Sequence, residues 1–388
     1  MAFLIQNQIG IVVFLGIIVS IALSNIFVLR RSRRDKHDGP LPRISVLVPA
    51  RNEQDNIEGC LISLLTQDYP DFEVLSLDDD SKDETWEKMR ALAASHRELR
   101  VIKGEPLPQG WIGKHWGCHQ LASAASGDLL LFTDADTRHQ PSSLRTAAAA
   151  LTQSRSDLVS VLPKQNAASF AEKLIVPIIY WSMLSFLPLA LAYRIRIPSL
   201  SFALGQFMLI RYPAYRDVEG HSSIRGHVLD DLQLARNLKS KGMGWRVIDG
   251  TDQVECRMYR GLKQAFGGLS KNLFAVFDYN IPVFVWIWIL TVFWAPIIVL
   301  LLVPSGVFHS NPLLFLSATA VVLSLISWAL TTFRFSYSWY LPLLYPLVAW
   351  VAVIFAFSSM IMTLRGSTMW KDRRVKHVRR GEGASRTD

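Results

Sequence analysis

Residues 129–136 read LLLFTDAD, an apolar run that leads into an acidic group. Four apolar residues in a row predict a strand that is buried on both faces, and two aspartates follow at its end. Two further apolar runs end in polar groups. ISVLVP at residues 44–49 precedes Ala50-Arg51-Asn52-Glu53, and FEVLSL at residues 72–77 precedes three aspartates. Because ligands bind beyond the carboxyl ends of parallel strands, we expect these groups to share one crevice.

Segments with helical periodicity separate these runs, so strands and helices alternate along the chain. This alternation predicts an α/β fold with a mostly parallel sheet and helices on both faces. The expected strands are residues 44–49, 72–77, 101–102, 129–133, 158–162, 206–210 and 245–248. The expected helices are residues 57–66, 83–95, 114–125 and 142–153.

The ends of the chain have a different composition. Of 388 residues, 41 are Lys or Arg and 32 are Asp or Glu, yet residues 1–29 carry no charge and residues 281–364 carry only Arg334. A membrane span needs about 20 apolar residues, so these stretches exclude a purely soluble protein and a disordered chain. Three distant cysteines exclude a disulfide-stapled scaffold, match no zinc pattern, and are expected to be reduced thiols that serve packing.

Two basic clusters follow the apolar ends, at residues 30–36 and 365–380. The positive-inside rule keeps the first cluster in the cytoplasm, so residues 1–29 are expected to be an anchor with its N-terminus outside, not a cleaved signal peptide. Because the clusters lie next to spans, we expect them to attract anionic lipid head groups, and we expect no nucleic-acid partner.

Residues 174–193 are uncharged, but a single span there would divide the soluble domain between the two sides of the membrane. Pro177 and Pro188 favour a helix pair that lies in the interface or re-enters it. Three C-terminal spans are expected, at residues 281–303, 313–333 and 339–364. They would place the basic tail outside, against the positive-inside rule, so either one segment does not cross fully or the tail breaks the rule.

This organisation predicts four parts. They are an anchor and basic linker (1–42), a catalytic domain with an apolar insertion (43–272, insertion 174–193), transmembrane helices (273–365) and a basic tail (366–388).

The acidic groups indicate chemistry at a cation. Asp134 and Asp136, two residues apart at a strand end, repel each other unless a cation lies between them, and Mg²⁺ or Mn²⁺ binds carboxylates together with substrate phosphates. The alternative is a turn and helix N-cap, where aspartate is common. Asp230 and Asp231 can likewise be a favourable first helical turn or can supply a general base.

Together these motifs resemble family 2 glycosyltransferases, which have the nucleotide-sugar-binding GT-A fold. The matching segments are Val48–Glu53, Leu77–Asp83, Asp134–Asp136, Gly205-Gln206 and Asp230–Leu232, and the resemblance covers about residues 43–272. Residues 107–120 (LPQGWIGKHWGCHQ) are similar to membrane-bound members that are associated with carotenoids and hopanoids.

The resemblance implies a role for each matching residue. Asp136 and Asp134 would hold the metal, and Asp231, with Asp230, would be the catalytic base of an inverting displacement. Lys114 would meet the diphosphate, and Arg260 and Lys271 are further candidate cations. The full set expected to bind the nucleotide sugar is Pro49, Asn52, Glu53, Asp78, Asp79, Lys114, Asp134, Gln206, Arg260 and Lys271.

Two departures qualify the resemblance. The Gln-x-x-Arg-Trp motif of processive members is absent near Gln264, which argues against a polymer synthase. Asp80 stands where the family often has glycine, and a Cβ is disfavoured there if the position needs a positive φ, although Asp tolerates it better than most residues.

His115 and His119 lie one helical turn apart, but with no third ligand nearby we do not expect them to form a metal pair.

The expected function is the transfer of a sugar to the hydroxyl of a membrane lipid, with a carotenoid or related terpenoid alcohol as the best acceptor. The alternatives are a polyprenyl-phosphate or ceramide-type acceptor, or a non-catalytic scaffold that binds nucleotide sugar. The expected location is the plasma (inner) membrane, with several spans and a cytoplasmic catalytic domain.

Overall fold

A computed structural model describes residues 2–29, 41–276, 283–302, 311–365, 369–370 and 373–374. The chain forms two compact units. One comprises residues 1–28, 167–191 and 259–365, and the other comprises residues 29–166, 192–258 and 366–388. We call the first the helical unit and the second the sheet unit. The basic cluster at residues 30–36 and most of the cluster at residues 365–380 lie outside the described residues.

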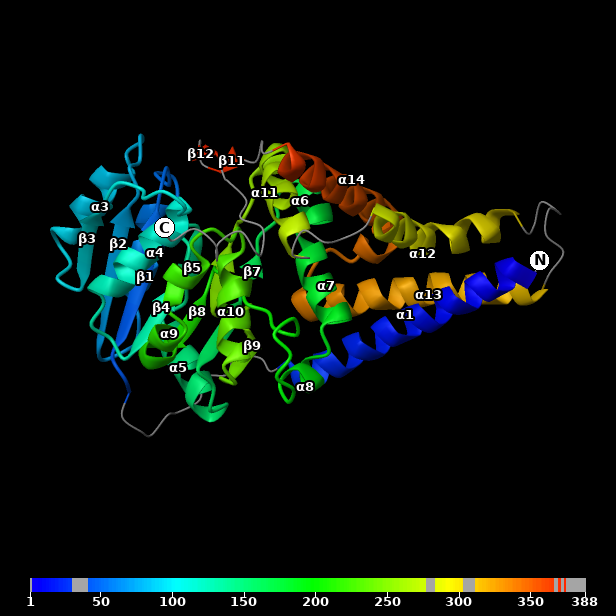
Figure 1. Ribbon diagram of the computed structural model, residues 1–388, viewed down its shortest axis with the longest axis horizontal. Coiled ribbons are helices and arrows are strands. Elements are labelled where there is room, and N and C mark those ends of the chain that lie inside the picture. Colours follow the sequence, from blue (N-terminus) through cyan, green and yellow to red (C-terminus); the bar gives the residue numbers. More distant parts are fainter. Residues whose placement is uncertain are drawn as a thin grey trace, which may run out of the picture. The chain divides into compact units, whose positions relative to one another are not determined.

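The sheet unit is built on a seven-stranded sheet in the order β3-β2-β1-β4-β8-β6-β9 (Figure 1). Its strands are β1 (Ile44–Ala50), β2 (Phe72–Asp78), β3 (Leu99–Lys103), β4 (Leu129–Phe132), β6 (Leu158–Leu162), β8 (Met208–Arg211) and β9 (Trp245–Asp249). All neighbouring strands are parallel except β8, which is antiparallel to both β4 and β6. The predicted α/β fold with a mostly parallel sheet is therefore confirmed.

Helices cover both faces of this sheet because its strands are apolar on both sides. Val46 and Val48 belong to a core cluster with Ile57 and Leu144, which come from α2 and α5. Leu47 points to the opposite face by the period-2 rule, and there α4 packs on β1 and β2. The helices of this unit are α2 (Ile57–Leu65), α3 (Thr85–Ala93), α4 (Gly113–Ala124), α5 (Ser143–Gln153), α9 (Tyr212–Asp217), η1 (Gly220–Ile224) and α10 (Asp230–Ser240).

A second, three-stranded sheet in the order β5-β10-β7 lies next to the acidic segment that follows β4. Its strands are β5 (Thr137–His139), β7 (Lys164–Gln165) and β10 (Val254–Cys256). β5 follows directly after the Asp134-Ala135-Asp136 segment, and Cys256 of β10 pairs with Thr137. This pairing brings Cys256 next to the acidic segment. A two-stranded ribbon of β11 (Met369–Trp370) and β12 (Arg373–Arg374) completes the described strands.

The helical unit contains the apolar segments of the chain. Its helices are α1 (Ala2–Val28), α6 (Phe170–Ile175), α7 (Pro177–Phe186), α11 (Gly261–Val276), α12 (Val283–Leu302), α13 (Asn311–Phe335), η2 (Leu341–Leu344) and α14 (Tyr345–Leu364), and α8 (Leu189–Ala192) ends at its boundary. Among the described residues, three helical segments are long and apolar enough to cross a membrane, namely residues 2–28, 311–335 and 341–364. A shorter apolar helix covers residues 287–302.

Asn25 fixes the apolar insertion to α1. Its side chain is fully buried and donates to the carbonyl oxygens of Leu184 at 2.8 Å and Leu187 at 2.7 Å. Its Oδ1 accepts the backbone N–H of Leu189 at 3.0 Å. These three bonds satisfy the backbone at the break between α7 and α8, which Pro188 imposes.

The direction of α14 is set by its contacts with α12 and α11. At its start, the ring of Tyr345 lies 5.9 Å from that of Phe293, halfway along α12. Val353 and Ala356 pack against Ile289 and Leu290, nearer the start of α12. At its end, Ser359 Oγ accepts the backbone N–H of Phe274 in α11 at 2.9 Å. α14 is therefore antiparallel to α12 and points the same way as α13 (Figure 1).

Candidate active site

Lys114 contacts two of the predicted acidic residues, Asp134 and Asp230. Its Nζ lies 2.8 Å from Asp134 Oδ1 and 3.5 Å from Asp230 Oδ2. Lys114 is in the first turn of α4, Asp134 follows β4, and Asp230 opens α10. Although burial opposes the charge of Lys114, the two aspartates hold its pKa well above its ordinary value. The sheet edge thus brings together residues that are more than a hundred positions apart.

Asp231 lies beside the same lysine. Its Oδ2 accepts the backbone N–H of Gly205 at 2.9 Å, and its Oδ1 accepts that of Leu232 at 2.7 Å. A Cβ on Gly205 would lie 2.9 Å from Lys114 Nζ and 3.7 Å from Asp231 Oδ2, so a side chain at position 205 would displace the end of Lys114. Burial, followed by the charge of Asp230, raises the pKa of Asp231 to about 6.

Asp136 has the surroundings that a cation ligand needs. Its Oδ1 is buried and has no hydrogen-bond partner among the described residues. Burial, then the charges of Asp134 and Glu53, raise the pKa of Asp136 to about 7. A divalent cation would pair this orphaned oxygen and remove the repulsion between the carboxylates. The residues that the sequence assigned to a metal therefore fit Mg²⁺ or Mn²⁺.

Gln206 is linked to Asp136 through Cys256. Its Nε2 donates to Cys256 Sγ at 2.9 Å, and its Oε1 accepts from Gln165 Nε2 at 2.7 Å. The Cys256 thiol in turn bonds the Asp136 carboxylate. This chain of contacts orients Asp136, and direct binding of the nucleotide sugar by Gln206 stays a prediction.

The loops after β1 and β2 are bonded to each other. Arg51, which sequence reasoning left without a role, donates to the carbonyl oxygens of Asp79 and Asp80. Asn52 Oδ1 accepts the backbone N–H of Lys82 at 2.9 Å. Asp80 has a φ of +56°. The position therefore needs a positive φ, which disfavours most residues with a Cβ. Aspartate is among the residues that tolerate this conformation.

The other predicted nucleotide residues lie at this same edge. Pro49 belongs to β1, and a Cβ on Gly117 of α4 would meet it at 3.4 Å. Glu53 donates its backbone N–H to Thr85 Oγ1 at 2.8 Å. Asp78 and Asp79 are buried at the end of β2. The structure therefore collects these predicted residues in one region, while their contact with a nucleotide stays a prediction.

Arg260 and Lys271 belong to the helical unit. The backbone N–H of Arg260 donates to Gln264 Oε1 at 2.8 Å, just before α11, and Lys271 lies within α11. Their contact with the diphosphate stays a prediction. The two histidines of α4 have different surroundings: His115 Nε2 lies 3.9 Å from Asp230 Oδ1, whereas the His119 ring packs against Trp111 and Trp116.

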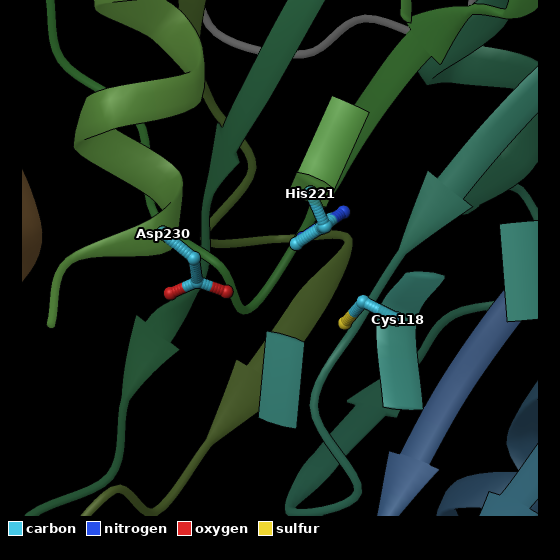
Figure 2. A group of neighbouring side chains, drawn as sticks. All are labelled: Cys118, His221 and Asp230. Carbon is cyan, nitrogen blue, oxygen red and sulfur yellow. The ribbon is translucent and has the colours of Figure 1, made fainter. Parts of the chain in front are cut away.

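Sequence reasoning missed one group beside the site. Cys118, which was read as a packing residue, and His221, which lies in no motif, approach Asp230 (Figure 2). His221 is in η1, a short helix between α9 and α10 without a periodic sequence pattern. Only the three-dimensional fold brings this group together.

Comparison with known proteins agrees with this geometry. Residues 45–218 match the family model described as Glycosyl transferase family 2. The 4,4'-diaponeurosporenoate glycosyltransferase of Staphylococcus haemolyticus is 27% identical over 236 residues, which are 59% of this chain and 60% of that protein. The match thus spans less than two thirds of that relative. The Beta-monoglucosyldiacylglycerol synthase of Trichormus variabilis is 30% identical over 119 residues, 30% of this chain and 25% of that one.

Among solved structures, the chain is similar to the mannosyltransferase PcManGT from Pyrobaculum calidifontis, determined in complex with GDP-Man and Mn²⁺. The TM-score is 0.56 at 16% identity, and the match covers 93% of this chain and 99% of that one. This likeness shows the GT-A fold. The domain at residues 45–218 matches glycosyltransferase family 2, and the chain resembles the carotenoid-associated members of that family.

Proposed function

We propose that the protein transfers a sugar, with inversion, from a nucleotide-diphosphate sugar to the hydroxyl of a membrane lipid. The observation that carries this proposal is the convergence of Lys114, Asp134, Asp230 and Asp231 at one edge of the sheet. A diphosphate needs cations, and an acceptor hydroxyl needs a base, and this cluster supplies both within one unit.

The nucleotide sugar is held by the strand-end loops. Pro49, Asn52, Glu53, Asp78 and Asp79 contact the nucleoside. Asp136 and Asp134 would hold Mg²⁺ or Mn²⁺, which stabilises the charge that develops on the departing diphosphate. Lys114 contributes a fixed positive charge at the same place, and Arg260 and Lys271 are further cations for the phosphates. Gln206 orients Asp136 through Cys256.

Asp231 is the general base. Two backbone N–H groups fix its carboxylate, and a pKa of about 6 leaves it ionised at neutral pH yet basic enough to accept a proton. The acceptor oxygen forms a bond to the anomeric carbon as the bond from that carbon to the diphosphate breaks. The hydroxyl proton passes to Asp231, and attack from the face opposite the leaving group inverts the configuration.

The apolar segments support a lipid acceptor, and a carotenoid or related terpenoid alcohol is the acceptor that the Staphylococcus relative's name favours. Within the helical unit, α1 and the α7–α8 turn line an open groove of about 520 Å³. Gly16, Ser20, Pro188 and Leu191 are among its lining residues. We propose that the insertion and α12 admit the lipid, and that the protein is a multi-pass protein of the plasma membrane with a cytoplasmic sheet unit.

One further acceptor is favoured by a specific comparison. The relative named Beta-monoglucosyldiacylglycerol synthase indicates that a glycerolipid should be tested beside the terpenoid alcohols.

The test is to express the chain in hosts that make candidate lipids and to search by mass spectrometry for a lipid shifted by one sugar. Asp231→Asn should abolish the product while nucleotide-sugar binding, measured by calorimetry, is retained. Asp217→Asn makes the same change at an exposed aspartate of the sheet unit and should have no effect. Unreduced product with Asp231→Asn removes the base assignment, and the absence of product from every lipid class rejects the lipid acceptor.

A further inference from the structure

Cys118, His221 and Asp230 form a group of potential metal ligands that the proposed reaction does not use as a set. They come from α4, η1 and α10, and all three are buried. One ligand atom from each, namely a sulfur, a ring nitrogen and a carboxylate oxygen, lies within 4.8 Å of the other two. Figure 2 shows the three side chains approaching one another from separate parts of the chain.

The histidine supplies an independent sign of a ligand. His221 is fully buried, and its Nε2 has no hydrogen-bond partner within the part of the chain that the structure describes. Buried polar atoms without a partner are rare, and an unseen ion or water is a common reason for them. The other ring nitrogen is occupied, because Nδ1 lies 2.8 Å from the hydroxyl of Tyr215.

This arrangement matches the surroundings of a metal-bound histidine. Such a histidine usually donates its second ring N–H to an oxygen, which fixes the ring and its tautomer. If Nδ1–H donates to Tyr215 Oη, Nε2 carries the lone pair that can bind a metal. Tyr215 Oη also accepts the backbone N–H of His221 at 3.2 Å, so two contacts hold the ring in place.

We propose that Cys118, His221 and Asp230 bind a zinc ion that joins α4 to α10. Mixed sulfur, nitrogen and oxygen ligands suit Zn²⁺, whereas Mg²⁺ and Mn²⁺ prefer oxygen, so this site is distinct from the one at Asp134 and Asp136. The ligand atoms of tetrahedral zinc lie about 3.5 Å apart. Side-chain rotations that move each ligand atom by about 1 Å therefore bring the three ligands to this spacing, and the fourth position is left for water.

The charges balance at this site. When zinc binds, the Cys118 thiol loses its proton to solvent and a sulfur–zinc bond forms. One thiolate and one carboxylate together offset the two positive charges of Zn²⁺, and the exchange of one proton for the ion raises the net charge of the group by one. Lys114 Nζ lies 3.5 Å from Oδ2 of Asp230, and His115 Nε2 lies 3.9 Å from its Oδ1.

The zinc ion would position two functional parts of the reaction that we propose. α4 carries Lys114 and α10 carries Asp231, and the ligands Cys118 and Asp230 belong to these same two helices. The inference rests on the proposed function only for this consequence. Its test does not depend on turnover, so a failed glycosylation assay and a failed zinc assay are distinguishable.

The test is elemental analysis of the full-length protein, purified without chelators in lipid nanodiscs. We expect about one zinc per chain, and X-ray absorption should show one sulfur at about 2.3 Å from the metal. Less than a tenth of a zinc per chain after dialysis against free Zn²⁺, or a metal shell without sulfur, overturns the proposal. These measurements use the unmodified chain, so a variant that fails to fold does not prevent a decision.

Variants then locate the site. Cys118→Ser should lower the zinc content at least tenfold, whereas Cys60→Ser, the same change at another buried thiol of the sheet unit, should leave it unchanged. Tyr215→Phe should lower zinc affinity about 10- to 100-fold, because it removes the oxygen that orients His221. Equal zinc content in Cys118→Ser and Cys60→Ser overturns the assignment of the ligands.

Discussion

Asn25→Leu should loosen the apolar insertion from α1. Asparagine is unusual within an apolar helix, and near the end of α1 its side chain is fully buried and makes three hydrogen bonds to the chain between Leu184 and Leu189. Leucine has a similar volume but no polar atom. The substitution therefore leaves two carbonyl oxygens and one N–H group without their partner.

The cost follows from these three bonds. Side-chain hydrogen bonds within membrane proteins average about 0.6 kcal/mol, and those in soluble proteins reach about 1.5 kcal/mol. Three bonds therefore contribute about 2–4 kcal/mol to holding the α7–α8 turn on α1. A loss of this size raises the population of the detached turn about 30- to 1,000-fold, since each 1.4 kcal/mol is a factor of about ten.

Hydrogen exchange measured by mass spectrometry on the full-length protein in nanodiscs tests this expectation. The peptide that covers residues 184–189 should exchange faster by that factor in Asn25→Leu. Ser20→Ala is the matched control, because Ser20 also lies on α1 but bonds only its own helix, at Gly16 O. Unchanged protection of residues 184–189 in Asn25→Leu would refute the reasoning, since the three bonds would then contribute nothing measurable.

Three further outcomes are expected. Lys114→Met should weaken nucleotide-sugar binding about 10- to 100-fold by calorimetry, because a charged hydrogen bond contributes about 1.5–3 kcal/mol; Lys114→Arg should bind more tightly than Lys114→Met, and equal binding by the two contradicts this role. Burial lowers the pKa of His139 to about 3, so below pH 6.5 the unfolded chain binds a proton that the native chain does not. Stability should therefore fall with pH by about 1.4 kcal/mol per unit between pH 6.5 and 3, and His139→Asn should flatten the slope in thermal unfolding; identical slopes would exclude His139 as the source. Finally, Ser336→Cys and Arg365→Cys should react with an impermeant maleimide from the same side of sealed vesicles, because α13 and α14 point the same way, and labelling from opposite sides would show that α14 crosses.

Much of the sheet was predictable from the sequence because its strands are short apolar runs that end in polar groups. The run at residues 129–132 forms β4 as expected, and Asp134 after it contacts Lys114. β8 was predicted to start two residues early, because Gln206 and Phe207 are buried like the strand but only residues from Met208 onward are strand. A pattern of apolar residues does not indicate the direction of a strand, so the antiparallel direction of β8 could not be predicted.

The parts that escaped prediction depend on long-range pairing. β5 has only three residues, and it exists because β10, more than a hundred residues later, pairs with it. The role of Gln206 behind Asp136 depends on Cys256 in that same strand. Likewise, Arg51 bonds backbone carbonyl oxygens in the loop after β2, and a carbonyl group carries no residue-specific signal in the sequence.

The direction of α14 addresses the sidedness that composition alone left in conflict. Three complete crossings after a cytoplasmic domain would carry the basic tail outside, against the positive-inside rule. Because α14 starts beside the middle of α12 and points the same way as α13, residues 336–344 return into the helical unit instead. Non-helical backbone at membrane depth is tolerated only where its polar groups are satisfied within the protein. That condition is met at several positions here: Tyr337 N–H donates to Thr332 O at 3.0 Å, and Leu341 and Leu343 donate to Ser338 O and Tyr340 O at 3.0 and 3.1 Å. We propose that α14 is re-entrant, which would place Arg365 at the end of the helical unit where α13 ends, as the positive-inside rule requires of a basic tail.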